Sequence, residues 1–108
     1  MTAGMKEIDA FDRSYSDRIR DAVWAAIVEA SRDPRTGVAA LRNYEIYDAL
    51  LQLQAMILGS SKETNSPTRT RETCNEFARR LRRLIAQYRQ RYAREGMPFD
   101  VIHTDEMQ

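Results

Sequence analysis

The chain has 108 residues, enough for one domain with one modest hydrophobic core. Apolar residues make up 43% and charged residues 31%, with a net charge of +1. These values are typical of a globular domain and exclude a chain that is basic throughout. The N-terminus lacks an apolar signal segment, and the longest apolar run covers residues 22–28. A bilayer span needs about 18 apolar residues. We therefore expect no membrane association and a cytoplasmic protein.

The chain offers few groups for catalysis or metal binding. Cys74 is the only cysteine, which excludes an intrachain disulfide and a thiolate zinc site. His103 is the only histidine, and no other ligand stands near it at metal-site spacing. No glycine-rich phosphate loop or nucleophile motif occurs. We expect no catalytic residue, no metal and no cofactor, and hence no enzyme.

The first predicted helix covers residues 9–32, preceded by a flexible N-terminus at residues 1–8. Pro34 and Gly37 end the helix. Trp24 and Val28 are one turn apart and lie off the main apolar stripe of this helix. Trp24 is either packed at an edge or an anchor for a partner chain, since tryptophan is enriched in interfaces. The stripe itself recurs with helical spacing at Ile8, Phe11, Tyr15, Ile19, Val23, Ile27 and Ala30.

The second predicted helix ends at Leu58, where Gly59 can supply a left-handed cap. Its beginning has two interpretations. Thr36 could cap a helix that starts at residue 37 and bends near residues 42–43, or Asn43 could cap a helix that starts at residue 44. We predict the earlier start, giving a helix over residues 37–58.

This second helix has more apolar surface than a three-helix bundle can cover. Its apolar arc spans about 260° at 3.6 residues per turn, and only Glu45, Asp48 and Gln52 form a polar back. The excess predicts a homodimer that shares this helix. The predicted interface residues are Tyr44, Tyr47, Leu51, Leu58, Trp24 and Val28.

The third predicted helix covers residues 67–95, with Ser66 as its N-cap and Pro67 at its first position. Gly96 ends it. Cys74 falls on the apolar stripe of this helix, so we predict a buried and unreactive thiol. The stripe comprises Thr70, Cys74, Phe77, Ala78, Leu81, Leu84, Ile85, Tyr88 and Tyr92.

Arginine dominates the rest of this helix. Residues 77–94 contain seven arginines and no acidic residue. Arg79, Arg83 and Arg94 lie on the back, while the other arginines flank the stripe on both sides. A helix that reads a DNA groove should gather such groups on one exposed side. We therefore favour a solvated or protein-facing surface over nucleic-acid contact through Arg79, Arg83 and Arg94.

Together these patterns predict an all-α fold: a three-helix bundle in a single helical domain over residues 9–96, dimerising through the second helix. The tail, residues 97–108, either folds back on the bundle, docks on another protein or stays disordered. The function we expect is non-enzymatic: a small intracellular interaction or assembly protein, a homodimer open to an unknown protein partner. The alternative is a DNA- or RNA-binding accessory or regulatory protein. A third interpretation is a chaperone-like module that clamps a partner helix against the second helix.

Overall fold

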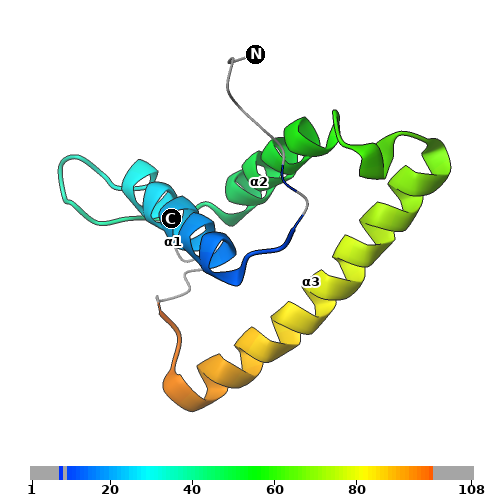
Figure 1. Ribbon diagram of the computed structural model, residues 1–108. Helices are drawn as coiled ribbons and strands as arrows, with labels where there is room; N and C mark the ends of the chain where they lie inside the picture. Colours follow the sequence, from blue (N-terminus) through cyan, green and yellow to red (C-terminus); the bar gives the residue numbers. More distant parts are fainter. Residues whose placement is uncertain (1–7, 9, 99–108) are drawn as a thin grey trace. The chain divides into compact units, whose positions relative to one another are not determined.

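The computed structural model describes residue 8 and residues 10–98, and its regular structure there is helical (Figure 1). The elements are α1 (Arg13–Ala30), α2 (Asn43–Leu58), the 3-10 helix η1 (Lys62–Thr64) and α3 (Pro67–Glu95). The all-α prediction is confirmed. The predictions for the N-terminal residues 1–8 and the tail fall almost wholly outside the described residues.

The chain divides into two compact units, residues 1–54 and 55–108. The first unit contains α1, the turn that follows it and most of α2. The second contains the last turn of α2, η1 and α3. The predicted single domain over residues 9–96 stays a prediction.

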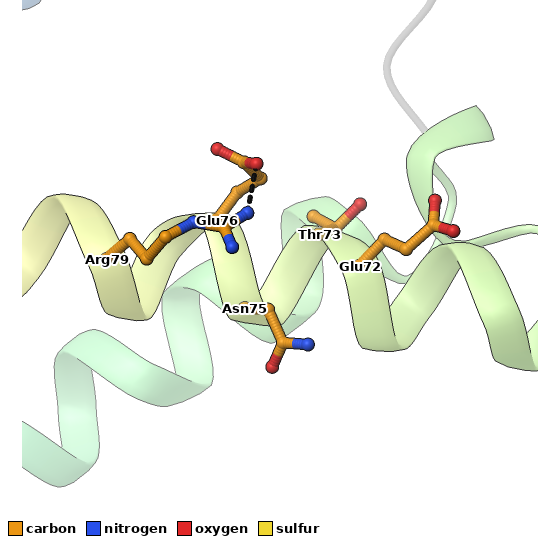
Figure 2. Close-up of a pocket in the computed structure, with 5 residues that line it drawn as sticks. All are labelled: Glu72, Thr73, Asn75, Glu76 and Arg79. Atoms are coloured by element: carbon orange, nitrogen blue, oxygen red, sulfur yellow. Dashed lines mark hydrogen bonds and ion pairs between the residues drawn. The ribbon is translucent and has the colours of Figure 1, made fainter.

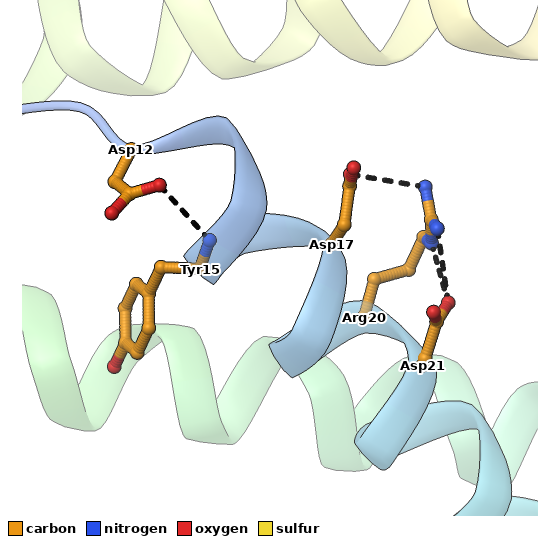
Figure 3. Close-up of polar contacts among 5 residues, drawn as sticks. All are labelled: Asp12, Tyr15, Asp17, Arg20 and Asp21. Carbon is orange, nitrogen blue, oxygen red and sulfur yellow. Dashed lines mark hydrogen bonds and ion pairs between the residues drawn. The ribbon is translucent and has the colours of Figure 1, made fainter.

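Helix α1 is shorter than predicted at both ends. Asp12 has an extended backbone, and its carboxylate accepts a hydrogen bond from the amide of Tyr15 at 3.1 Å (Figure 3). This N-cap sets the first helical residue at Arg13, because a capping residue lies outside the helix. At the other end the Ser31 hydroxyl donates to the carbonyl of Ile27 at 2.7 Å, and the helix stops at Ala30.

The predicted start of the second helix at residue 37 is wrong, because residues 38–40 pair instead with residues 31–33, which directly follow α1. The Asp33 amide donates to the carbonyl of Val38 at 2.9 Å, and the Ala40 amide donates to the carbonyl of Ser31 at 3.1 Å. An isolated antiparallel bridge joins the two segments. Gly37 has φ of 75°, a conformation that interrupts any right-handed helix.

Thr36 therefore does not cap a helix. Its hydroxyl accepts a hydrogen bond from the amide of Val38 at 3.3 Å, a local turn of the kind that threonine favours.

Helix α2 begins at Asn43, within a residue of the alternative start. Its end at Leu58 is confirmed, but the left-handed cap is not. Among the described glycines only Gly37 and Gly96 have positive φ, so Gly59 ends α2 in an ordinary turn.

Helix α3 has the predicted bounds and the predicted cap. The Ser66 hydroxyl accepts from the amide of Arg69 at 3.2 Å, and Pro67 occupies the first helical position. At the far end Gly96, with φ of 84°, takes the chain out of the helix. The capping residues at the two ends of α3 act only on their neighbours and agree with one another, so both ends of the helix could be predicted from the sequence.

The segment between α2 and α3 is a folded joint and not a plain linker. Three side chains of α3 hydrogen-bond its backbone. Thr73 donates to the carbonyl of Glu63 at 2.8 Å, Thr70 to that of Thr64 at 3.3 Å, and Arg69 to that of Lys62 at 3.2 Å. The Thr64 hydroxyl in turn donates to the last carbonyl of α2, at Leu58. These bonds attach the joint to the first two turns of α3.

No residue in the described part of the chain is buried. The large apolar side chains of all three helices keep substantial exposure, including Tyr44 at 83%, Ile57 at 74% and Leu81 at 58%. A 108-residue chain of this composition normally encloses a core. The helices are therefore ordered, while many of their large apolar side chains keep substantial exposure in the described part of the chain.

The Ser66 cap gives the first prediction. Ser66→Ala removes the oxygen that satisfies the Arg69 amide, so it should lower the free energy of unfolding by about 1 kcal/mol. Urea titration followed by helical circular dichroism measures this. Ser60→Ala is the matched control, because the Ser60 hydroxyl donates weakly to a carbonyl at 3.5 Å and caps no amide. Equal effects of the two substitutions would contradict the capping role.

Candidate interaction surfaces

The side of α2 predicted to form a dimer interface is exposed along its length. Tyr44, Tyr47, Leu51 and Leu58 lie within about 60° of one another around the helix axis. Leu51 is 65% exposed, and Leu58 is partly exposed. The rings of Tyr44 and Tyr47 meet edge to face, with centroids 6.1 Å apart and an interplanar angle of 87°. We call these four residues the α2 patch.

A second apolar surface lies between α1 and α2, on a different side of α2 from the patch. It is an open groove of about 600 Å³, which we call the α1–α2 groove. The α1 wall is mainly Val23, Ala26, Ile27 and Ala30, and the α2 wall is mainly Ile46, Ala49, Leu50 and Leu53. Ser31, Ala40, Arg42 and Glu45 complete the lining.

This groove was not predicted from the sequence. The signal available was the set of small side chains, since Ala26, Ala30 and Ala49 stand among larger apolar residues on facing helices. Small residues leave room between two helices, and a third helix can enter that room. The 260° arc of α2 thus has two parts, the groove wall and the α2 patch.

Trp24 and Val28 lie on α1, one turn apart, and neither lines the groove. Trp24 is 44% exposed and Val28 is partly exposed. The four residues of the α2 patch lie on one helix, whereas Trp24 and Val28 lie on another. The inclusion of Trp24 and Val28 in the same interface stays a prediction.

The apolar stripe of α3 is also uncovered. Phe77 is 41% exposed, Ile85 44% and Tyr88 37%. Tyr88 and Tyr92 stack along the helix with ring centroids 5.9 Å apart. Cys74 is exposed, so the prediction of a buried thiol is wrong for a single copy of the chain. Cys74 lies on the stripe as the helical period predicts, but a place on an apolar stripe does not by itself bury a side chain.

The arginines of α3 make local ion pairs as well as a basic surface. Arg79 pairs with Glu76 one turn earlier, and Arg91 pairs with Glu95 one turn later at 2.9 Å. The hydrogen bond from Arg91 to the Glu95 carboxylate raises the pKa of the guanidinium, so Arg91 is charged at any physiological pH. Arg83 and Arg94, the other two candidate phosphate contacts, are exposed.

A shallow hollow of about 430 Å³ lies along the first half of α3 (Figure 2). Its lining comes from this one helix: Glu72, Thr73, Asn75, Glu76 and Arg79. Figure 2 shows Asn75 pointing away from the ion pair of Glu76 and Arg79. Two carboxylates against one guanidinium repel a phosphate, so this hollow is a poor anion site.

The acidic pair on α1 is held by an arginine. Arg20 lies between Asp17 and Asp21 and contacts them at 3.3 and 3.0 Å (Figure 3). All three side chains are well exposed, as expected for a solvated face and not for an acid/base pair.

Within residues 10–98 no cluster of three or more His, Cys, Asp or Glu side chains is arranged to hold a metal ion. Of the helices described, none combines the length and the hydropathy that a bilayer span requires.

The exposure of Cys74 gives the second prediction. At a protein concentration low enough to keep copies apart, a thiol reagent should label Cys74 at a rate close to that in denaturant, because the side chain is open to solvent. Absorbance of the released chromophore measures both rates. A native rate far below the denatured rate under these conditions would show that one copy covers its own α3 stripe.

Three surfaces stand out among the described residues: the α2 patch, the α1–α2 groove and the arginine-flanked stripe of α3. No protein-family model matches the chain, and neither the curated proteins nor the solved structures searched contain a match.

Proposed function

We propose that this chain is a non-enzymatic helical interaction protein that works as a homodimer and assembles through the α2 patch. The observation that carries the proposal is the absence of any buried side chain among the described residues, together with exposed apolar side chains along the length of α2. Apolar surface gains about 25 cal/mol for each Å² removed from water. Monomers rarely leave large contiguous apolar patches exposed, and such patches typically mark interfaces.

A second copy is the partner that fits the α2 patch best. A two-fold axis brings the same patch together from both copies, so the patch must complement itself. Tyr44, Tyr47, Leu51 and Leu58 carry no charge, and aromatic residues are enriched in interface cores. Asp48 lies on the back of α2, where it hydrogen-bonds Gln52 at 2.5 Å, so it stays out of the apolar contact. Trp24 and Val28 extend the interface in this proposal.

Within the assembly the three helices pack as a bundle. Each helix has an apolar face, and a bundle is the arrangement that covers the faces of several helices at once. In this proposal the helices are ordered in each copy and the core forms on association, so dimerisation adds stability. A parent chain that stays monomeric would leave the α2 surface to another occupant, such as the helix of a different protein held by a chaperone-like clamp.

The alternative function is nucleic-acid binding by α3. Seven arginines between residues 79 and 94 attract any polyanion at low salt. Two observations favour the protein-binding proposal. Arg79 is already paired with Glu76, and the arginines surround the helix instead of lining one side.

The dimer proposal predicts the effect of a charge in the patch. Leu51→Glu should weaken self-association by about 30-fold or more, because two carboxylates would meet at the axis and a central apolar contact would be lost. Light scattering across a concentration series measures the mass. Leu51 is exposed in one copy, so the helical circular dichroism of dilute protein should change little.

Gln52→Glu is the matched control for this variant. It adds the same charge at the next position, on the polar back of α2, and should leave the mass unchanged. A parent chain that is monomeric at micromolar concentration would disprove the homodimer. Equal dissociation by both variants would move the interface away from the α2 patch.

If nucleic-acid binding is the function, a complex with DNA should persist as the salt concentration rises. The protein-binding proposal predicts the opposite: we expect no mobility shift of a short DNA duplex at about 150 mM salt, because non-specific phosphate contacts weaken steeply as salt rises. A shift that persists at this salt, and that the double variant Arg79→Ala with Arg83→Ala abolishes, would instead establish the alternative. Arg35→Ala, which removes an exposed arginine outside α3, is the control.

A further inference from the structure

We propose that Gln54 fixes how two copies of the chain pair. The two α2 helices lie parallel and in register, and the two Gln54 amides hydrogen-bond each other across the two-fold axis. This orientation rests on the proposed homodimer and deepens it: the α2 patch supplies the apolar contact, and Gln54 decides which way round the two helices meet.

Gln54 is a polar residue within the repeat of the α2 patch. The patch residues Tyr44, Tyr47, Leu51 and Leu58 leave one gap in an alternation of three- and four-residue steps, and Gln54 fills it. This alternation is typical of the seam along which two helices meet in a coiled coil. Gln54 is not among the residues that line the α1–α2 groove, so it belongs to the patch side of α2.

The Gln54 amide has no partner in a single copy. Gln54 is exposed, and its side chain makes no hydrogen bond to any residue that the structure describes. Gln52 differs, because on the polar back of α2 its amide donates to the carboxylate of Asp48. Closing the patch against a second copy removes water from Gln54, and a buried amide without a partner destabilises a contact. The interface must therefore supply that partner.

A second Gln54 satisfies this requirement best. An amide side chain carries both a donor and an acceptor, so two of them complement each other across a two-fold axis. Among the patch residues the leucines have no polar side-chain atom, and each tyrosine offers a single hydroxyl. In coiled coils a single polar residue within an apolar seam fixes the register, at some cost in affinity.

The meeting of the two amides selects the parallel arrangement. In a parallel pair in register every seam residue faces its own copy, so the amides meet and the whole patch is covered. An antiparallel pair with Gln54 at the axis sets residue 47 opposite residue 61, beyond the end of α2 at Leu58. Tyr44 and Tyr47 then lie outside the contact. Only the parallel pair serves both the amide and the apolar residues.

Disulfide exchange between the ends of the seam measures the orientation. In a Cys74→Ser background one chain carries Tyr44→Cys, and an isotopically heavy chain carries Leu58→Cys. The two are mixed in a glutathione redox buffer until the disulfides reach equilibrium, and mass spectrometry measures the amount of each. A disulfide needs its two Cα atoms within about 7 Å. Residues 44 and 58 are about 21 Å apart along the helix, so the products distinguish the two orientations.

We expect the two like disulfides, 44 to 44 and 58 to 58, to exceed the mixed disulfide by about tenfold or more, because parallel helices bring equal positions together. A mixed disulfide in equal or greater amount would mean antiparallel or random pairing and would overturn the proposal. So would a dimeric mixture that forms neither kind, because the ends of the seam would then lie apart.

Gln54→Leu tests the amide itself and needs no engineered cysteine. The apolar seam becomes continuous, so self-association should tighten by roughly tenfold in a light-scattering concentration series. Combined with the cysteine variants, Gln54→Leu should also abolish the excess of like disulfides, because nothing then fixes the register. Gln52→Leu is the matched control, since it makes the same change on the polar back and should alter neither quantity. Unchanged affinity of Gln54→Leu, or a persisting excess of like disulfides, would contradict the role of Gln54.

The mass of the Cys74→Ser parent separates this inference from the function on which it rests. A monomeric parent would disprove the homodimer, and the pairing of Gln54 with it. A dimeric parent whose cysteine variants form mainly the mixed disulfide would leave the homodimer standing and disprove only the parallel pairing.

Discussion

The constraint on which this molecule depends is the apolar surface of its helices, which stays exposed to solvent in the described part of the chain. Each helix is well formed: α1 and α3 have side-chain caps, and ion pairs between neighbouring turns stabilise their polar faces. Yet no side chain in the described part of the chain is buried. Helix propensity and capping supply local order, whereas the free energy of a fold comes mainly from burial. This gap between local order and burial is the observation behind the proposed homodimer.

How far the sequence predicts the fold depends on whether the deciding interactions are local. Ser66 and Pro67 at one end of α3 and Gly96 at the other act on their neighbours, so both ends could be predicted. The start of α2 could not, because the backbone of residues 38–40 pairs with residues 31–33, which follow α1. Thr36 had the residue type of a helix cap, but that pairing overrode the preference.

The same distinction applies to the candidate surfaces. The apolar arc of α2 and the stripe of α3 follow from helical periodicity, and the structure places those residues on the expected sides. The α1–α2 groove could not be predicted, because it depends on which faces of two helices oppose each other. The exposure of Cys74 was missed for a related reason. A place on an apolar stripe predicts burial only when something packs against that stripe.

The alanines of the groove have a further consequence for the thermodynamics of association. Ordering a buried leucine or methionine costs side-chain rotamer entropy, whereas alanine has none to lose. Ala26, Ala30 and Ala49 are therefore equally ordered in the open groove and under any side chain that packs on them. On the two walls only the branched side chains, such as Ile27, Leu50 and Leu53, have rotamer freedom to lose on association.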